Sequence, residues 1–150
     1  MTNFSEEPTS IYLGANFGFS DRTYRYGMLK ESRRLLSWGV HLEDFDGDGF
    51  LELFTANGHV FPQADNEHTG STYGQADTLW RVGPLAKAVR VTSESDASIL
   101  NAKLGTRGSA VGDVDGDGSP DLVLARIDGP AALALGPRSP ERRVVLRLEG

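Results

Sequence analysis

A short acidic turn that occurs twice constrains this chain more than any other feature. The first copy reads DFDGDGFLE over residues 44–52, and the second reads DVDGDGSPD over residues 113–121. Each copy has acidic side chains at its positions 1, 3, 5 and 9 and glycine at position 6. Carboxylates on alternating residues converge only if the chain wraps around a centre, and glycine permits that sharp turn. Because a cluster of oxygen ligands suits a hard cation, the pattern predicts two Ca²⁺ sites.

The predicted ligands are the four acids of each turn and the backbone carbonyl at position 7. They are Asp44, Asp46, Asp48, the backbone oxygen of Phe50, and Glu52 in the first turn, and Asp113, Asp115, Asp117, the backbone oxygen of Ser119, and Asp121 in the second. A carbonyl ligand leaves its own side chain free to vary, which fits Phe in one copy and Ser in the other. Without metal the clustered carboxylates should raise one another's pKa, so metal binding should be coupled to folding.

Two alternatives compete with a calcium loop in a β-hairpin. An EF-hand requires a bidentate Glu at position 12, where the two copies have Thr55 and Leu124, and it requires flanking helices. The flanks here alternate as strands do. Solvated Asp-Gly turns without metal are common between strands, but retention of all four acids in both copies argues against them.

The residues around the turns repeat with the same spacing of 69 residues, from Asp44 to Asp113. The further matches are Gly39 with Gly108, Leu53 with Leu122, and Ala56 with Ala125. In the first copy, Trp80 in the strand after the hairpin lies 36 positions beyond Asp44. In the second copy, Ala134 lies 21 positions beyond Asp113. The 15 extra residues are expected in the loop 57–76.

The repeat predicts an all-β fold. Short strands are expected at 11–14, 37–43, 51–56, 78–82, 89–92, 108–113, 122–125, 132–135 and 143–149, with a helical turn within 28–36. Several short strands per repeat are typical of one β-propeller blade, so we predict a partial β-propeller of about two four-stranded blades. Two blades cannot close a ring, and the sequence stops at Gly150 directly after a strand-like run. We therefore expect a fragment of a larger protein.

The sequence allows a prediction of which side chains are buried in two segments, residues 37–43 and residues 16–34. Val40 and Leu42 alternate with glycine and polar residues, as in a half-buried strand. Residues 16–34 mix aromatic and basic side chains, which fits either a binding strip or a solvated face on a β-hairpin or loop with its aromatic side chains packed inward. We predict the second because the chain is acidic. The aromatic residues are Phe17, Phe19, Tyr24 and Tyr26, and the basic ones are Arg22, Arg25, Lys30, Arg33 and Arg34.

The sequence GSAVGDVDGDGSPDLVL at 108–124 resembles the core of the FG-GAP/VCBS repeat, the blade of integrin α-chain-type β-propellers. RGSA at 107–110 and NGHV at 57–60 resemble the ASPIC/UnbV group, which includes the cartilage acidic proteins. The resemblance implies propeller blades over 1–136 as part of a seven-bladed propeller, a linker over 137–142, and the first strand of a truncated ASPIC/UnbV domain over 143–150. This sequence departs from the family pattern at Glu52, where Asp is usual, and at 134–136, where an aromatic residue and Asn are frequent.

The resemblance also implies a function and a location. It predicts a calcium-binding structural or interaction module of a secreted, periplasmic or cell-surface protein. This module is expected to contact a protein or glycan partner through its blade loops, and to pack against the remaining blades of the propeller in the full-length protein. No signal peptide and no membrane-inserted segment are recognisable in the sequence. The net charge of −6 is a local property, because the two turns contribute eight of the 21 acids and the remainder has 15 basic against 13 acidic residues. Nucleic-acid binding is not expected.

The sequence contains no signature of a known catalytic site. It lacks Gly-x-Ser-x-Gly, His-Glu-x-x-His, P-loop and Gly-x-Gly-x-x-Gly motifs, and it has no cysteine. His41, His59 and His68 have no metal-ligand spacing; His59 could have a special role or stabilise a turn. We do not expect an enzyme. A calcium-dependent propeller hydrolase or lyase component and a non-functional fragment of a longer protein stay as alternatives.

Overall fold

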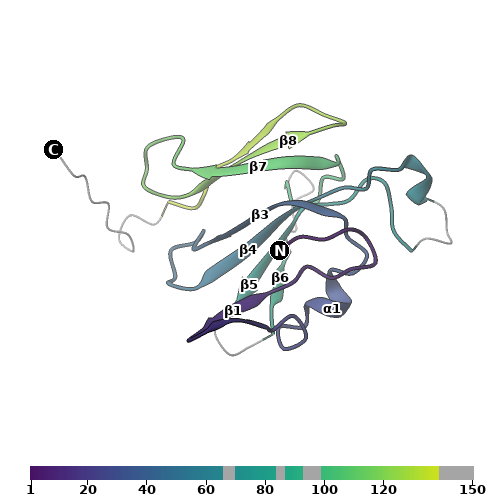
Figure 1. The fold of residues 1–150 in the computed structure, drawn as a ribbon. Coiled ribbons are helices and arrows are strands. Elements are labelled where there is room, and N and C mark those ends of the chain that lie inside the picture. Colours follow the sequence, from purple (N-terminus) through teal and green to yellow (C-terminus); the bar gives the residue numbers. More distant parts are fainter. Residues whose placement is uncertain (66–69, 84–86, 93–98, 139–150) are drawn as a thin grey trace.

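The computed structural model describes residues 1–65, 70–83, 87–92 and 99–138, which form three antiparallel β-sheets (Figure 1). None of the three sheets closes on itself within these ranges. The elements are β1 (Tyr12–Ala15), β2 (Gly18–Asp21), α1 (Met28–Glu31), β3 (Ser37–Glu43), β4 (Leu51–Asn57), the 3-10 helix η1 (Pro62–Asp65), β5 (Thr78–Val82), β6 (Val89–Val91), β7 (Thr106–Gly112), β8 (Asp121–Arg126) and β9 (Ala132–Ala134). The predicted all-β class is confirmed. The strand expected at 143–149 lies outside the described residues.

Two of the sheets are built on the same plan. The first sheet has the order β3-β4-β5-β6 and the second the order β7-β8-β9, so four described strands are present in one copy and three in the other. Leu53 pairs with Trp80 in the first sheet, and Leu122 pairs with Ala134 in the second. Since Leu53 and Leu122 match in the repeat, the alignment of Trp80 with Ala134 is confirmed.

The predicted insertion is also confirmed. The connection between β4 and β5 spans residues 58–77, whereas that between β8 and β9 spans 127–131, so the first is 15 residues longer. The inserted chain contains η1, and Tyr73 N–H donates a hydrogen bond to Asp65 Oδ1 (2.8 Å). The insertion therefore leaves the sheet register unchanged, and its described part includes a 3-10 helix.

The second sheet lies against one face of the first (Figure 1). A hydrophobic cluster fills the interface, and its buried members are Phe45, Phe54, Ala56, Leu122 and Leu124. At the edge of this interface β3 and β7 approach so closely that a Cβ on Gly39 would collide with Ser109 Oγ. His41 Nε2 lies 2.9 Å from Ser109 Oγ and its ring stacks on Phe54. The interface is therefore apolar in its centre and has a hydrogen-bonded edge.

The half-buried strand predicted at 37–43 is present, but its apolar side chains lie on the face turned away from the second sheet and are themselves exposed. Val40 and Leu42 are exposed and line an open apolar cleft with Tyr12 and Leu13. The covered face carries Gly39 and His41 instead. Close approach of two sheets selects a small residue there, so apolar alternation alone points to the wrong face.

The opposite face of the first sheet packs on the N-terminal segment. Leu53 and Trp80 form a second buried cluster with Tyr26 and Met28. Met28 begins α1, which confirms the helical turn predicted within 28–36. Neither helix in the described ranges has the length and apolar character that crossing a membrane requires.

The hairpin predicted in the N-terminal segment is present, but the expected inward packing of its aromatic side chains is wrong. Among the described strands, β1 and β2 pair only with each other. Phe17, Phe19 and Tyr24 are exposed, and of the four aromatic side chains only Tyr26 is buried. A two-stranded hairpin that joins no other sheet has no core of its own to cover these rings.

A buried polar network closes the end of β4 that is remote from the acidic turn. The Asn57 N–H donates to Asp77 Oδ1 (2.8 Å), and its side-chain oxygen accepts from Ser37 Oγ (2.6 Å). Thr106 Oγ1, on the second sheet, donates to Asp77 Oδ2 (2.8 Å). Burial raises the pKa of Asp77, and these hydrogen bonds and the charge of Arg126 offset only part of that effect.

We expect Asp77→Asn to remove a pH-dependent part of the free energy of unfolding. Because the pKa of Asp77 is raised on folding, its stabilising contribution is full below its ordinary value of 3.8 and falls as pH rises through the folded-state value. The stability of wild type relative to Asp77→Asn should thus decline in urea denaturation as pH rises above 3.8 and through the raised pKa of the folded state. Asp128→Asn, at an exposed carboxylate, is the control. A wild-type advantage that stays constant over this range would contradict the raised pKa.

Candidate metal centre

The first acidic turn joins β3 to β4 and folds around its own carboxylates. Asp44 accepts hydrogen bonds from Asp48 N–H (Oδ1, 3.0 Å) and Gly49 N–H (Oδ2, 3.0 Å). Asp46 Oδ1 accepts a second contact from Asp48 N–H (3.1 Å), and Asp48 Oδ1 accepts from Phe50 N–H (2.8 Å). The backbone amides thus hold the three aspartates toward the inside of the loop.

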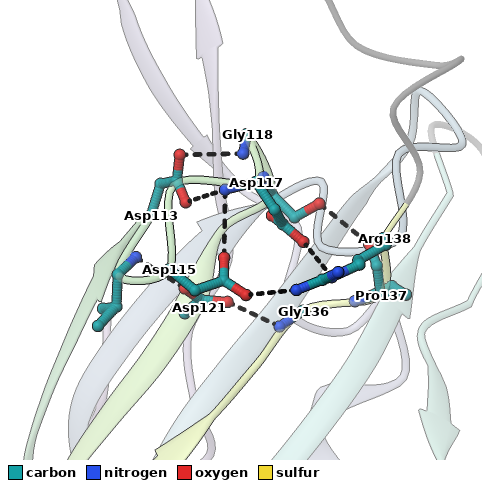
Figure 2. A network of polar contacts seen from close by, with 10 residues as sticks. Asp113, Asp115, Asp117, Gly118, Asp121, Gly136, Pro137 and Arg138 are labelled. Atoms are coloured by element: carbon teal, nitrogen blue, oxygen red, sulfur yellow. Dashed lines mark hydrogen bonds and ion pairs between the residues drawn. The ribbon is translucent and has the colours of Figure 1, made fainter.

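The second turn, between β7 and β8, has the same four contacts (Figure 2). Asp117 N–H and Gly118 N–H donate to the two oxygens of Asp113 (both 3.0 Å). Asp117 N–H also contacts Asp115 Oδ1 (3.2 Å), and Ser119 N–H donates to Asp117 Oδ1 (2.8 Å). Two loops that differ at positions 2, 7, 8 and 9 therefore adopt one conformation.

Two glycines in each turn have the left-handed backbone conformation that favours glycine. Gly49 and Gly118, at position 6, have φ of 88° and 85°. Gly47 and Gly116, at position 4, have φ of 72° and 76°. A requirement for glycine was predicted at position 6 only, although the glycine shared by both copies at position 4 indicates the same requirement.

Carboxylate oxygens converge in each loop closely enough for one metal ion. Asp44, Asp46 and Asp48 each offer an oxygen, and these lie within 4.8 Å of one another. In the second loop the group is Asp113, Asp115 and Asp121, so the acid at position 9 takes the place of the acid at position 5. Such groups could hold a metal ion, and three hard oxygen donors from one short loop suit Ca²⁺. Asp117 and Glu52 lie in the same two loops but outside these groups.

The acids at position 9 hold the loops closed. Glu52 Oε2 accepts a hydrogen bond from Phe45 N–H (3.0 Å), and Asp121 Oδ2 accepts from Val114 N–H (2.7 Å). Asp121 Oδ1 also accepts from Gly136 N–H (2.8 Å). Both acids are buried, with 2% and 1% of their surface exposed. Each therefore ties position 2 of its turn to the strand after it.

The electrostatics of these two acids differ. The pKa of Glu52 is raised, first by burial and then by the nearby charges of Asp46 and Asp48. The pKa of Asp121 is lowered, because the Gly136 and Val114 amides stabilise its ionised form. The expected mutual raising of pKa is thus wrong for Asp121. Hydrogen bonds from backbone amides outweigh the effect of burial there.

The two predicted carbonyl ligands are in different surroundings. Phe50 is exposed and lines the apolar cleft beside β3, whereas Ser119 is buried and its hydroxyl donates to the Pro137 carbonyl (3.0 Å). The side chain at position 7 thus serves the local packing of each loop. This difference is consistent with a backbone ligand, which remains a prediction.

Sequence reasoning missed an arginine at the mouth of each loop. Arg81 Nη2 lies 2.6 Å from Asp46 Oδ2, and its Nε lies 3.5 Å from Glu52 Oε1 and 4.0 Å from Asp48 Oδ2. Arg138 lies 3.4 Å from both Asp115 and Asp117 (Figure 2). Neither residue belongs to the turn motif. Arg81 could have been found from the pairing of β5 with β4, which sets it opposite Glu52.

Of the two histidines in the described ranges, neither His41 nor His59 belongs to the groups of acidic side chains that could hold a metal ion. His59 Nδ1 accepts the Phe61 N–H (3.1 Å), and its Nε2 lies 3.1 Å from Ser5 Oγ, which favours the turn-stabilising role. Arg107 braces the same turn through the carbonyls of Gly58 and His59 (both 2.7 Å) and lies over the Trp38 ring. His68 lies outside the described residues.

Comparison with known proteins adds no family assignment. The sequence matches no known protein-family model, and no curated protein matches it at a significant level. The resemblance to FG-GAP/VCBS and ASPIC/UnbV proteins therefore stays a prediction carried by the loop residues.

Proposed function

We propose that this chain is a calcium-binding structural module in which each acidic loop holds one Ca²⁺. The observation that carries the proposal is the shared loop conformation, in which the same four amide contacts orient the acids at positions 1, 3 and 5 of both turns. A dication bound there would neutralise the clustered charge and fix the hairpin that joins two strands. Calcium suits this flexible oxygen shell better than magnesium, which requires a tight octahedron and retains its waters.

We further propose that the two sheets are successive blades of a β-propeller. In support, they pack in a head-to-tail manner: Leu122 and Leu124 of the second sheet lie on the Phe54 and Ala56 face of the first. The repeat equivalent of Phe54 is Val123, which is 39% exposed on the outer face of the second sheet. Another unit added in the same way would cover Val123, and repetition of one such step builds a propeller.

The biological role of such a module follows from the resemblance. On that ground we propose an extracytoplasmic protein in which calcium-stabilised blades present loops to a protein or glycan partner. We propose the connection 58–77 for such a contact, because it is 15 residues longer than its counterpart at 127–131 in the second repeat.

Calcium titration tests the metal-binding proposal. We expect the melting temperature, followed by circular dichroism, to rise as Ca²⁺ reaches about 10 mM, since Kd values of extracellular calcium modules are about 10⁻⁴–10⁻³ M. Magnesium at the same concentration should give a smaller rise, and chelator should reverse the calcium effect. A cooperative melt that calcium leaves unchanged would reject calcium binding and return the loops to solvated Asp-Gly turns.

A further inference from the structure

The two loops differ in how their position-9 acid is satisfied. Both oxygens of Asp121 accept a backbone N–H, from Val114 and Gly136. Glu52 uses only Oε2 in this way; its Oε1 is buried and has no hydrogen-bond partner. A buried carboxylate oxygen without a hydrogen bond is costly when ionised, and a nearby positive charge lowers that cost. A cation near Glu52 Oε1 would therefore stabilise the first loop, whereas in the second loop backbone amides already stabilise both oxygens of Asp121.

Arg81 supplies positive charge at that place. Its guanidinium contacts Asp46 at 2.6 Å and lies within 4.0 Å of Glu52 and Asp48. The backbone of Arg81 pairs directly with Glu52 in the ladder between β5 and β4, which fixes its side chain at the loop. Asp46 and Asp48 belong to the group of oxygens that could hold a metal ion.

Arg138 is a weaker counterpart at the second loop. It contacts Asp115 and Asp117 at 3.4 Å each and does not reach the position-9 acid. Its side chain is 77% exposed, against 52% for Arg81, and it extends from the chain beyond β9 and not from a paired strand. Exposed ion pairs of this kind contribute little.

We propose that Arg81 is a built-in competitor for the metal ion of the first loop, so that the first loop binds Ca²⁺ more weakly than the second. This inference rests on the proposed calcium-binding function. Calcium entering the first loop must take Asp46 and Asp48 from the guanidinium, or share them with it at the cost of repulsion between two cations. In the second loop Arg138 competes less strongly for Asp115 and Asp117, so Ca²⁺ binding there costs less free energy. The two sites would then fill in sequence, the second loop first.

The test measures Ca²⁺ affinity at one loop at a time by isothermal titration calorimetry on the full 150-residue chain. Asp115→Asn isolates the first loop, and Asp46→Asn isolates the second. In the Asp115→Asn background, Arg81→Gln should raise affinity about tenfold, and Arg81→Lys, which keeps the charge without the planar fork, should raise it less. In the Asp46→Asn background, Arg138→Gln should change affinity by less than about threefold. Arg90→Gln, on the neighbouring strand β6, is the matched control and should have no effect.

The outcomes separate this inference from the proposed function. Weaker binding at the first loop that Arg81→Gln relieves supports the competitor role. Calcium binding at the first loop with unchanged or reduced affinity in Arg81→Gln overturns the inference and leaves the calcium-binding function standing. Binding at neither loop in any variant overturns both. Circular dichroism of each variant verifies folding, and if Arg81→Gln does not fold, the Arg81→Lys affinity decides the sign.

Discussion

Asp46→Asn and Asp115→Asn should each remove the calcium response of one loop, and the double variant should remove all of it. Asparagine keeps an oxygen to accept the amide of Asp48 or Asp117, so the substitution removes charge and leaves the loop conformation in place. With Kd of about 10⁻⁴–10⁻³ M, calcium at about 10 mM stabilises a site by about 1.4–2.7 kcal/mol. For a chain of this size the loss corresponds to about 3–10 °C in melting temperature per loop.

The measurement is a thermal melt with and without calcium for wild type, both single variants and the double variant. Glu31→Ala, which removes an exposed acid on α1, controls for the change in net charge and should retain the full calcium shift. Shifts that add up across the two loops indicate independent sites. A double variant that keeps the wild-type calcium shift would mean that calcium stabilises the protein from another place.

The duplicated turn made much of this fold predictable. Because the strands on both sides of each turn must pair across it, the repeat fixed two hairpins, and the match of Leu53 with Leu122 extended the register to Trp80 and Ala134. The length of the 58–77 insertion followed from the same match. The two hairpins, their register and the length of the insertion depend on patterns that repeat along the chain, so one sequence is enough to predict them.

Features that depend on contacts between distant segments were not predictable in the same way. The covered face of β3 carries Gly39 and His41 because β7 approaches it, and nothing in residues 37–43 reveals that neighbour. Arg81 reaches the first loop from a strand that follows a long insertion. Phe17 and Phe19 in the N-terminal hairpin stay exposed because no other described strand pairs with that hairpin. In each case the deciding partner lies far away in sequence.

Phe54→Ala should cost about 3–5 kcal/mol of unfolding free energy. Phe54 is fully buried between the two sheets, stacks on His41 and packs with Leu122 and Leu124. The lost ring leaves a cavity that two hydrogen-bonded sheets cannot collapse to fill. Because this interface joins the two repeats, the loss should appear in one cooperative urea transition.

Val123→Ala is the matched control, because Val123 occupies the same place in the second repeat as Phe54 in the first. It is 39% exposed on the outer face of the second sheet, so the substitution should cost less than about 1 kcal/mol. A cost for Phe54→Ala no larger than that for Val123→Ala would contradict the packing of the two sheets. Partial loss in two separate transitions would show that the sheets unfold independently, and head-to-tail packing would then contribute little to the stability of either repeat.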